Sequence, residues 1–81
     1  METKELRDEL KELVADVIEM DEFADDDHFI EDLGVDSMVA LEIIYEIEKK
    51  LKVVIPVKDI KGMETLNDVI RIVSEKLDSK L

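Results

Sequence analysis

Apolar residues recur at helical spacing near the start of the chain. Within residues 4–18 they follow the i, i+4, i+7, i+8 pattern of one helical face, and charged residues fill most positions between them. The apolar positions are Leu6, Leu10, Leu13, Val14, Val17 and Ile18. We therefore predict an amphipathic helix over residues 4–18.

A second pattern covers residues 37–51, a stretch without Gly or Pro. Asp36 is a favourable N-cap, so the pattern predicts a helix that starts beside it. Apolar residues surround much of this helix over its first three turns, whereas an ordinary surface helix needs only one apolar stripe. The helix therefore either lies centrally in the fold or presents a second apolar surface.

The helical periodicity fails between these two stretches. Residues 19–36 scatter a few apolar side chains among acids, and Gly34 interrupts them. A loop longer than about a dozen residues in a small domain is usually functional or disordered. Apolar side chains can anchor it to a core, and these are Phe23, Phe29, Ile30 and Leu33. We predict an ordered, functional loop.

The last third of the chain predicts a linker, a helical turn and a helix. Residues 53–56 are apolar but have no second strand pattern to pair with, so we expect a buried extended linker. Residues 57–61 can form one helical turn that ends at Gly62. Thr65 then caps a last helix, whose apolar face consists of Leu66, Val69, Ile70, Val73 and Leu77.

These elements predict an all-α fold in a single domain, 1–81. We expect a small four-helix bundle of three main helices and one short helix, with a long loop between helices 1 and 2.

Charge narrows the classes of function. The chain has 23 acidic and 11 basic residues, and its net charge of −12 repels nucleic acid and anionic membranes but attracts proteins with basic patches. Nine acids and no Lys or Arg lie between Glu19 and Asp36. No apolar run approaches the length of a membrane span, and the N-terminus has no signal-peptide pattern. We expect a cytoplasmic protein, monomeric because its charge opposes self-association.

The chain offers little for catalysis or metal binding. It has no cysteine, and its one histidine, His28, has no second His or Cys with which to form a metal site or a Cys–His pair. A calcium loop that starts at Asp25 would place Phe29 and Ile30 where an EF-hand needs a ligand and a Gly. We therefore expect neither a metal site nor an enzyme.

One segment carries a specific motif, which reads Asp32-Leu33-Gly34-Val35-Asp36-Ser37-Met38. It resembles the hallmark of the acyl carrier protein family, Asp-Leu-Gly-x-Asp-Ser followed by a hydrophobic residue. The surroundings also resemble that family: a Phe-Ile-Glu lead-in, a Glu-bearing apolar helix, and Val54-Ile55-Pro56 downstream. The resemblance extends from about Leu6 to Leu77, with the same order of helices.

This resemblance implies a carrier function. In the family, a separate phosphopantetheinyl transferase attaches 4′-phosphopantetheine from coenzyme A to the motif serine, here Ser37. The thiol of the arm then carries acyl groups as thioesters between enzymes of fatty acid, lipid or related biosynthesis. The free N–H groups of a helix start favour an attached phosphate, and Asp36 caps this helix. Ser37 lacks a nearby base, so the partner enzyme must activate it.

The resemblance also implies roles for the second helix and its surroundings. One face would line a cavity for an acyl chain, with Leu41, Ile44, Ile47 and Ile55 as pocket candidates. Enzymes with basic docking patches would contact Asp32, Met38, Val39, Glu42, Tyr45 and Glu48. For Leu41, Ile44 and Ile47 the sequence does not separate pocket lining from plain core.

The chain departs from fatty-acid carriers in its charges. Those carriers commonly present acids two residues after the serine, late in the second helix and across the short third helix. This chain has Val39, Lys49, Lys58 and Lys61 in those places. We hypothesise a dedicated carrier for one pathway, such as a specialised lipid, polyketide or cell-envelope acylation route.

Three alternatives stay open. A peptidyl or alanyl carrier would share the arm and differ in its cargo. An unmodified acidic helical interaction module would keep full activity after Ser37→Ala. An acidic calcium-binding helical protein would give a saturable calcium response that changes at Asp25 and Asp27 abolish.

Overall fold

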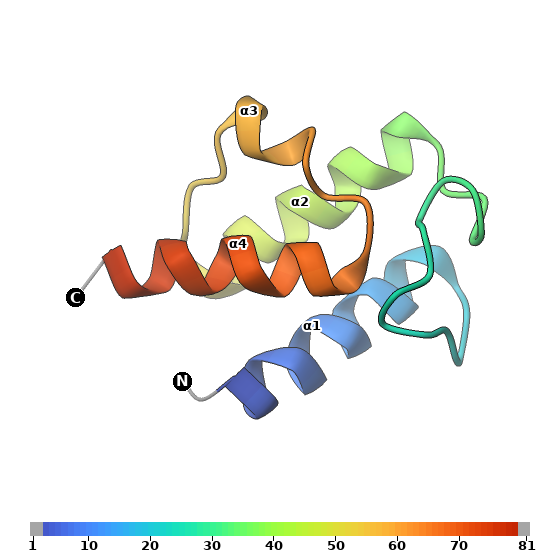
Figure 1. Ribbon diagram of the computed structural model, residues 1–81, viewed down its shortest axis with the longest axis horizontal. Helices are drawn as coiled ribbons and strands as arrows, with labels where there is room; N and C mark the ends of the chain where they lie inside the picture. Colours follow the sequence, from blue (N-terminus) through green and yellow to red (C-terminus); the bar gives the residue numbers. More distant parts are fainter. Residues whose placement is uncertain (1–2, 80–81) are drawn as a thin grey trace.

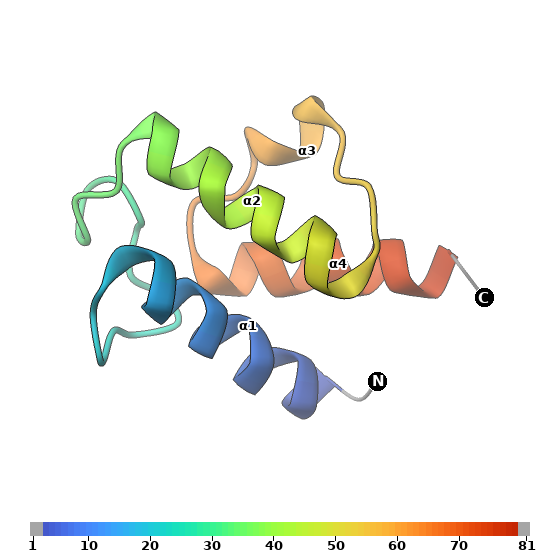
Figure 2. The same cartoon turned by 180° about the vertical axis from the view of Figure 1, so that it is seen from behind.

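The structure, a computed structural model, describes residues 3–79, and this part of the chain folds into four helices without a strand. The helices are α1 (Thr3–Ile18), α2 (Ser37–Leu51), α3 (Val57–Ile60) and α4 (Leu66–Ser79). The predicted all-α fold, with three main helices, one short helix and a long first loop, is confirmed. α1 packs against α2 and α4, and α3 lies on the other side of those two helices (Figures 1 and 2).

A single apolar core joins the three main helices. Its largest fully buried side chains come from α1, α2 and α4, and they are Leu6, Leu10, Val14, Ile47, Leu66, Val69 and Val73. Helical spacing places these side chains on the inward faces, where removal from water stabilises the fold by about 25 cal/mol per Å² of apolar surface.

The loop of residues 19–36 is ordered by apolar anchors, as predicted, but not by all of the predicted ones. Phe23 and Phe29 are buried, whereas Ile30 is 59% exposed, so its prediction as an anchor is wrong. Val35 is buried in its place. The reason is local: Val35 N–H donates to Phe29 C=O at 2.8 Å, which draws Val35 inward and leaves Ile30 on the outside of the turn.

The linker between α2 and α3 is extended, and its side chains alternate between core and solvent. Val53 and Ile55 are buried, but Val54 is 78% exposed, so the prediction that the whole run is buried is wrong. Successive side chains of an extended chain point to opposite sides, which makes this outcome unavoidable on a one-sided core. Glu48 Oε2 accepts the N–H of Ile55 at 2.9 Å and fixes the linker to α2.

Polar contacts join α3 to α4 and fix the start of α4. Asp59 Oδ2 pairs with Lys76 Nζ at 2.9 Å and joins α3 to α4. Thr65 Oγ1 accepts the N–H of Asp68 at 3.3 Å, and Asp68 Oδ2 accepts the N–H of Thr65 at 3.2 Å. The predicted cap at Thr65 is therefore confirmed as a reciprocal pair.

Candidate functional site

Ser37 is the first residue of α2, and its side chain is exposed. Asp36 precedes it in extended conformation (φ −89°, ψ 176°), and Asp36 Oδ1 accepts the N–H of Val39 at 2.9 Å. The predicted cap is present. The N–H groups of the first turn have no helical acceptor, and the helix dipole makes this end partly positive. Both features favour a negatively charged group on or beside Ser37.

The turn before Ser37 shows why the motif needs a glycine. Gly34 has φ 68°, in the left-handed region that residues with a Cβ rarely adopt. This conformation turns the chain between Leu33, whose N–H donates to His28 C=O, and Val35, whose N–H donates to Phe29 C=O. The segment that presents Asp36 and Ser37 is thus closed on itself.

A groove of about 420 Å³ opens beside Ser37. It lies between the loop, α2 and the segment that runs from α3 to α4. Its apolar lining residues are Phe29, Ile30, Ala40, Leu41, Ile60 and Met63. Its polar lining residues are His28, Ser37, Lys61 and Glu64. We refer to it as the Ser37 groove.

A smaller apolar cavity of about 30 Å³ adjoins the Ser37 groove and shares four lining residues with it, Phe29, Ala40, Ile60 and Met63. Ile43, Ile44 and Val69 complete its wall. A space of this size holds about one water or one methylene group. An exposed hydroxyl at a helix start, with a mostly apolar groove next to it, fits a phosphate ester that continues into a flexible chain.

The predicted pocket residues separate into two groups. Leu41 lines the Ser37 groove and Ile44 lines the small cavity. Ile47 and Ile55 are buried in the core and line neither of these two spaces. Ala40 and Met63 line both the groove and the cavity, but the sequence analysis did not predict them. Ala40 could have been predicted, because it is a small residue three positions after Ser37 and so lies on the same face of the helix.

The predicted partner-contact residues also differ in their surroundings. Met38 and Tyr45 are 79% and 60% exposed, and with Leu41 they form an apolar stripe at i, i+3 and i+7. α2 therefore does present a second apolar surface. The acids Asp32 and Glu42 are exposed, whereas Val39 and Glu48 are half-buried.

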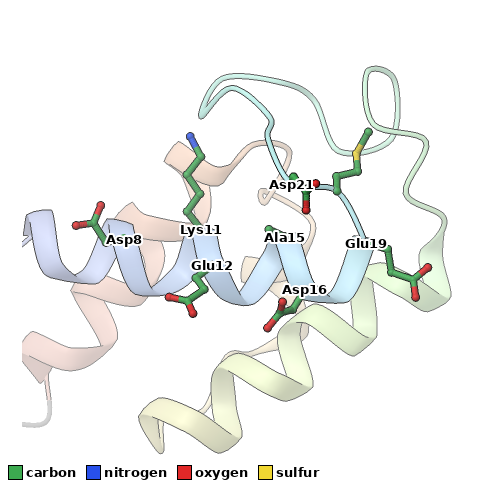
Figure 3. A pocket seen from close by; sticks show the side chains of 8 residues that line it. Asp8, Lys11, Glu12, Ala15, Asp16, Glu19 and Asp21 are labelled. Carbon is green, nitrogen blue, oxygen red and sulfur yellow. The ribbon is translucent and has the colours of Figure 1, made fainter.

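An open concavity of about 690 Å³ lies elsewhere, along the outer face of α1. Figure 3 shows its lining along α1, in which Lys11 points to the opposite side of the helix from Glu12 and Asp16. It shares no lining residue with the Ser37 groove. Within residues 3–79, no group of three His, Cys, Asp or Glu side chains is arranged to hold a metal ion.

Asp25, the first ligand of the calcium alternative, is already paired with two cations. Arg7 Nη1 lies 2.6 Å from Asp25 Oδ2, and Lys11 Nζ lies 2.8 Å from Asp25 Oδ1. The hydrogen bond from Lys11 is the largest cause of a lowered pKa at Asp25; partial burial opposes it and the hydrogen bond from Arg7 adds to it. These contacts fix the loop to α1 and leave the carboxylate poorly placed for calcium.

Among the described residues no helix is long and apolar enough to cross a membrane.

Comparisons with known proteins agree with the geometry of the site. The family described as phosphopantetheine attachment site matches residues 8–73. An acyl carrier protein of Clostridium perfringens is 39% identical over 70 residues, which cover 84% of this chain and 92% of that protein. The polyketide-8 synthase acyl carrier protein 2 of Streptomyces avermitilis is 38% identical over 73 residues, which cover 88% of this chain and 84% of that protein.

A solved structure gives the same fold. It belongs to a Mycobacterium tuberculosis protein provisionally described as an acyl carrier protein, and it superposes with a TM-score of 0.81 at 21% identity, covering 85% of this chain and 95% of that one. Proteins of this kind carry a covalently attached 4′-phosphopantetheine and are carriers, not catalysts; they interact with phosphopantetheinyl transferases and with biosynthetic enzymes. The chain belongs to the acyl carrier protein family.

Proposed function

We propose that Ser37 is the residue to which the 4′-phosphopantetheine arm is attached. The observation that supports this most directly is the position of its exposed side chain, at the first residue of α2 and on the lining of the Ser37 groove. When attached, the arm supplies a thiol that holds acyl groups as thioesters. The cap at Asp36 keeps the first turn of α2 formed, so that its N–H groups face the phosphate.

The mass of the intact protein tests this proposal. The protein is incubated with coenzyme A, magnesium and a broad-specificity phosphopantetheinyl transferase, alongside Ser37→Ala and Ser74→Ala. Ser74 is a half-buried serine of α4 and serves as the matched control. We expect a single phosphopantetheine gain in the parent and in Ser74→Ala, and none in Ser37→Ala. A gain in Ser37→Ala would assign the arm to another residue, and no gain in any folded sample would favour the unmodified interaction module.

We further infer where cargo and partners bind. The Ser37 groove and the small cavity behind it would shelter the acyl chain, with Leu41 and Ile44 in their walls. The apolar stripe of Met38, Leu41 and Tyr45, flanked by the exposed acids Asp32 and Glu42, would contact enzymes with basic docking patches. Glu48 already accepts a hydrogen bond from the linker, so we expect a smaller contribution from it.

The charges support a dedicated carrier over a general one. Lys58 and Lys61 are exposed on and just after α3, and Lys49 is exposed near the end of α2. A partner with basic residues opposite α3 would meet like charge there. Similarity to a protein named as a polyketide synthase carrier, besides the general carriers, supports a pathway of that kind. A peptidyl or alanyl cargo would use the same arm and is distinguished by which enzyme loads it.

The monomeric state, the single domain of residues 1–81 and the cytoplasmic location stay predictions from the sequence. Sedimentation of the purified protein checks the first.

A further inference from the structure

His28 makes contacts that the carrier function does not require of a surface histidine. Its Nδ1 accepts the backbone N–H groups of Ile30 and Glu31, each at 3.2 Å. Its Nε2 lies 3.0 Å from Oε2 of Glu64, in the connection between α3 and α4. One ring therefore holds a turn of the loop on one side and a segment 36 residues away on the other.

These contacts fix the tautomer of the ring. Because both groups at Nδ1 are donors, Nδ1 must be unprotonated, and the single proton of the neutral ring is on Nε2. Nε2–H then donates to Glu64 Oε2, so a neutral ring satisfies every contact at once. Addition of a second proton places a hydrogen on Nδ1, opposite two N–H groups, and both of those bonds are lost.

The turn that His28 begins leads directly to the candidate attachment site. The N–H of His28 donates to Asp32 Oδ2 at 2.8 Å, and the C=O of His28 accepts the N–H of Asp32 at 2.8 Å. The buried Phe29 next to it donates its N–H to Glu64 C=O at 2.8 Å. His28, Glu64 and Ser37 all line the Ser37 groove.

We propose that His28 is a proton-sensitive positioning residue: its neutral ring holds the turn that presents Ser37, and a charged ring releases that turn and loosens one wall of the groove. This inference rests on the proposed role of Ser37. Histidine is the side chain whose charge ordinarily changes between pH 5 and 8. The device would make attachment of the arm, and access to the groove, depend on whether this ring is neutral or charged.

Charged groups around the ring come from three segments. Asp27, Glu31 and Asp32 are neighbours of His28 in the loop. Glu64 contacts the ring from the connection before α4, and Lys61, the first residue after α3, lines the same groove as His28. The carboxylates attract a charged ring and Lys61 repels it. None of them restores an acceptor for the N–H groups of Ile30 and Glu31, so the ion pair with Glu64 can persist while the turn opens.

His28→Asn separates the positioning role from the titration. The Asn side-chain oxygen can accept the N–H two residues on, as in an Asx turn, and it does not titrate in this range. His28→Ala removes the acceptor at every pH. Glu64→Gln keeps an acceptor for Nε2–H but removes the negative charge.

The test records the amide signals of Ile30 and Glu31, and the ring nitrogens of His28, by NMR of the full chain from pH 8 to pH 5.5. We expect Nδ1 to be unprotonated at pH 8, and the two amides to change together with the ring. In His28→Asn the amide signals of Ile30 and Glu31 should stay constant over the same pH range. The amide signal of Val73 in α4 serves as the internal control. The proposal would be overturned if the ring carried its proton on Nδ1 at pH 8, or if the ring did not titrate. It would also be overturned if the amide signals of Ile30 and Glu31 stayed constant while the ring titrated.

The rate of arm attachment supplies the second readout. Dividing the rate of the parent by that of His28→Asn at each pH removes the pH dependence of the transferase itself. We expect this ratio, divided by its own value at pH 8, to fall at least about threefold when the ring is charged, since two hydrogen bonds of the turn are lost. A flat ratio across a demonstrated ring titration would overturn the inference. Absence of attachment to both proteins at pH 8 would instead count against the role of Ser37, and the NMR result would still decide the role of His28.

Discussion

Asp36 accepts a hydrogen bond from the backbone N–H of Val39 at 2.9 Å, and this contact makes Ser37 the first residue of α2. Because an N-cap acceptor offsets one unpaired N–H group, we expect Asp36→Ala to lower the free energy of unfolding by about 1 kcal/mol. It should also slow attachment of the arm, because the first turn frays. Urea denaturation and a time course of intact mass measure the two effects.

Asp36→Asn is the control for this prediction, since it keeps the capping oxygen and removes the charge. If the Asn variant is as stable as the parent but the arm is attached to it more slowly, the slower attachment is due to loss of the Asp36 charge, which the transferase recognises. No loss of stability in Asp36→Ala would contradict the capping role.

Gly34→Ala should destabilise the protein through the backbone alone. An added Cβ at Gly34 meets no atom within 4 Å, but the φ of 68° is unfavourable for Ala by about 1 kcal/mol. Gly34→Asn should recover part of this loss, because Asn tolerates the left-handed region better. Gly62→Ala is the matched control, since its Cβ would lie at an ordinary 3.6 Å from Asp59 O. Equal denaturation midpoints for both Ala variants would show that the Gly34 turn relaxes freely.

Asp25 should make stability fall in acid. Its pKa is lowered in the folded protein from the ordinary value of 3.8, mainly by the hydrogen bond from Lys11. A depressed carboxyl pKa stabilises the folded state above the ordinary value, and this contribution is lost as the pH falls through the lower folded value. Asp25→Asn should therefore cost about 1 kcal/mol at pH 7 and flatten the stability profile below about pH 4. A variant with an unchanged acid profile would contradict this assignment.

Lys58 should select against general partners. Lys58→Glu removes a like charge opposite a basic docking patch, so we expect several-fold faster turnover by a general fatty-acid ketosynthase at low salt. The gain should shrink at high salt, because exposed charges are screened. Lys4→Glu makes the same charge change on an exposed residue of α1, on the other side of the molecule from α3 (Figure 1). An equal gain in Lys4→Glu would attribute the effect to net charge, and full turnover of the parent would sink the idea of a dedicated carrier.

Ala40 should control access to the small cavity. It lines both that cavity and the Ser37 groove, so Ala40→Leu, which adds three carbons, fills a cavity that holds about one methylene group and also narrows the groove. We expect normal attachment of the arm but several-fold faster hydrolysis of a medium-chain thioester, because its chain is less sheltered. The acetyl thioester is the control and should hydrolyse at an unchanged rate. Equal protection of the medium chain in both proteins would place the acyl chain elsewhere.

The amino-acid sequence alone determined the helices and the identity of the candidate serine. Helical spacing of apolar residues is a local property, so it located α1, α2 and α4 and most of the core they bury. The caps at Asp36 and Thr65 are local too, because the acceptor and the N–H lie within three residues of each other.

Only the tertiary structure decided how the loop and the groove are built. The exposure of Ile30 and the burial of Val35 follow from a turn that is closed within the loop by the hydrogen bond from Val35 N–H to Phe29 C=O and is held against the distant Glu64 by the N–H of Phe29, and no periodicity in an 18-residue loop could reveal this. The Ser37 groove needs Met63 and Glu64 from the far side of the fold, and the bridge from His28 to Glu64 spans 36 residues. Such contacts depend on how the chain brings distant segments together, and the sequence pattern near each residue does not contain that information.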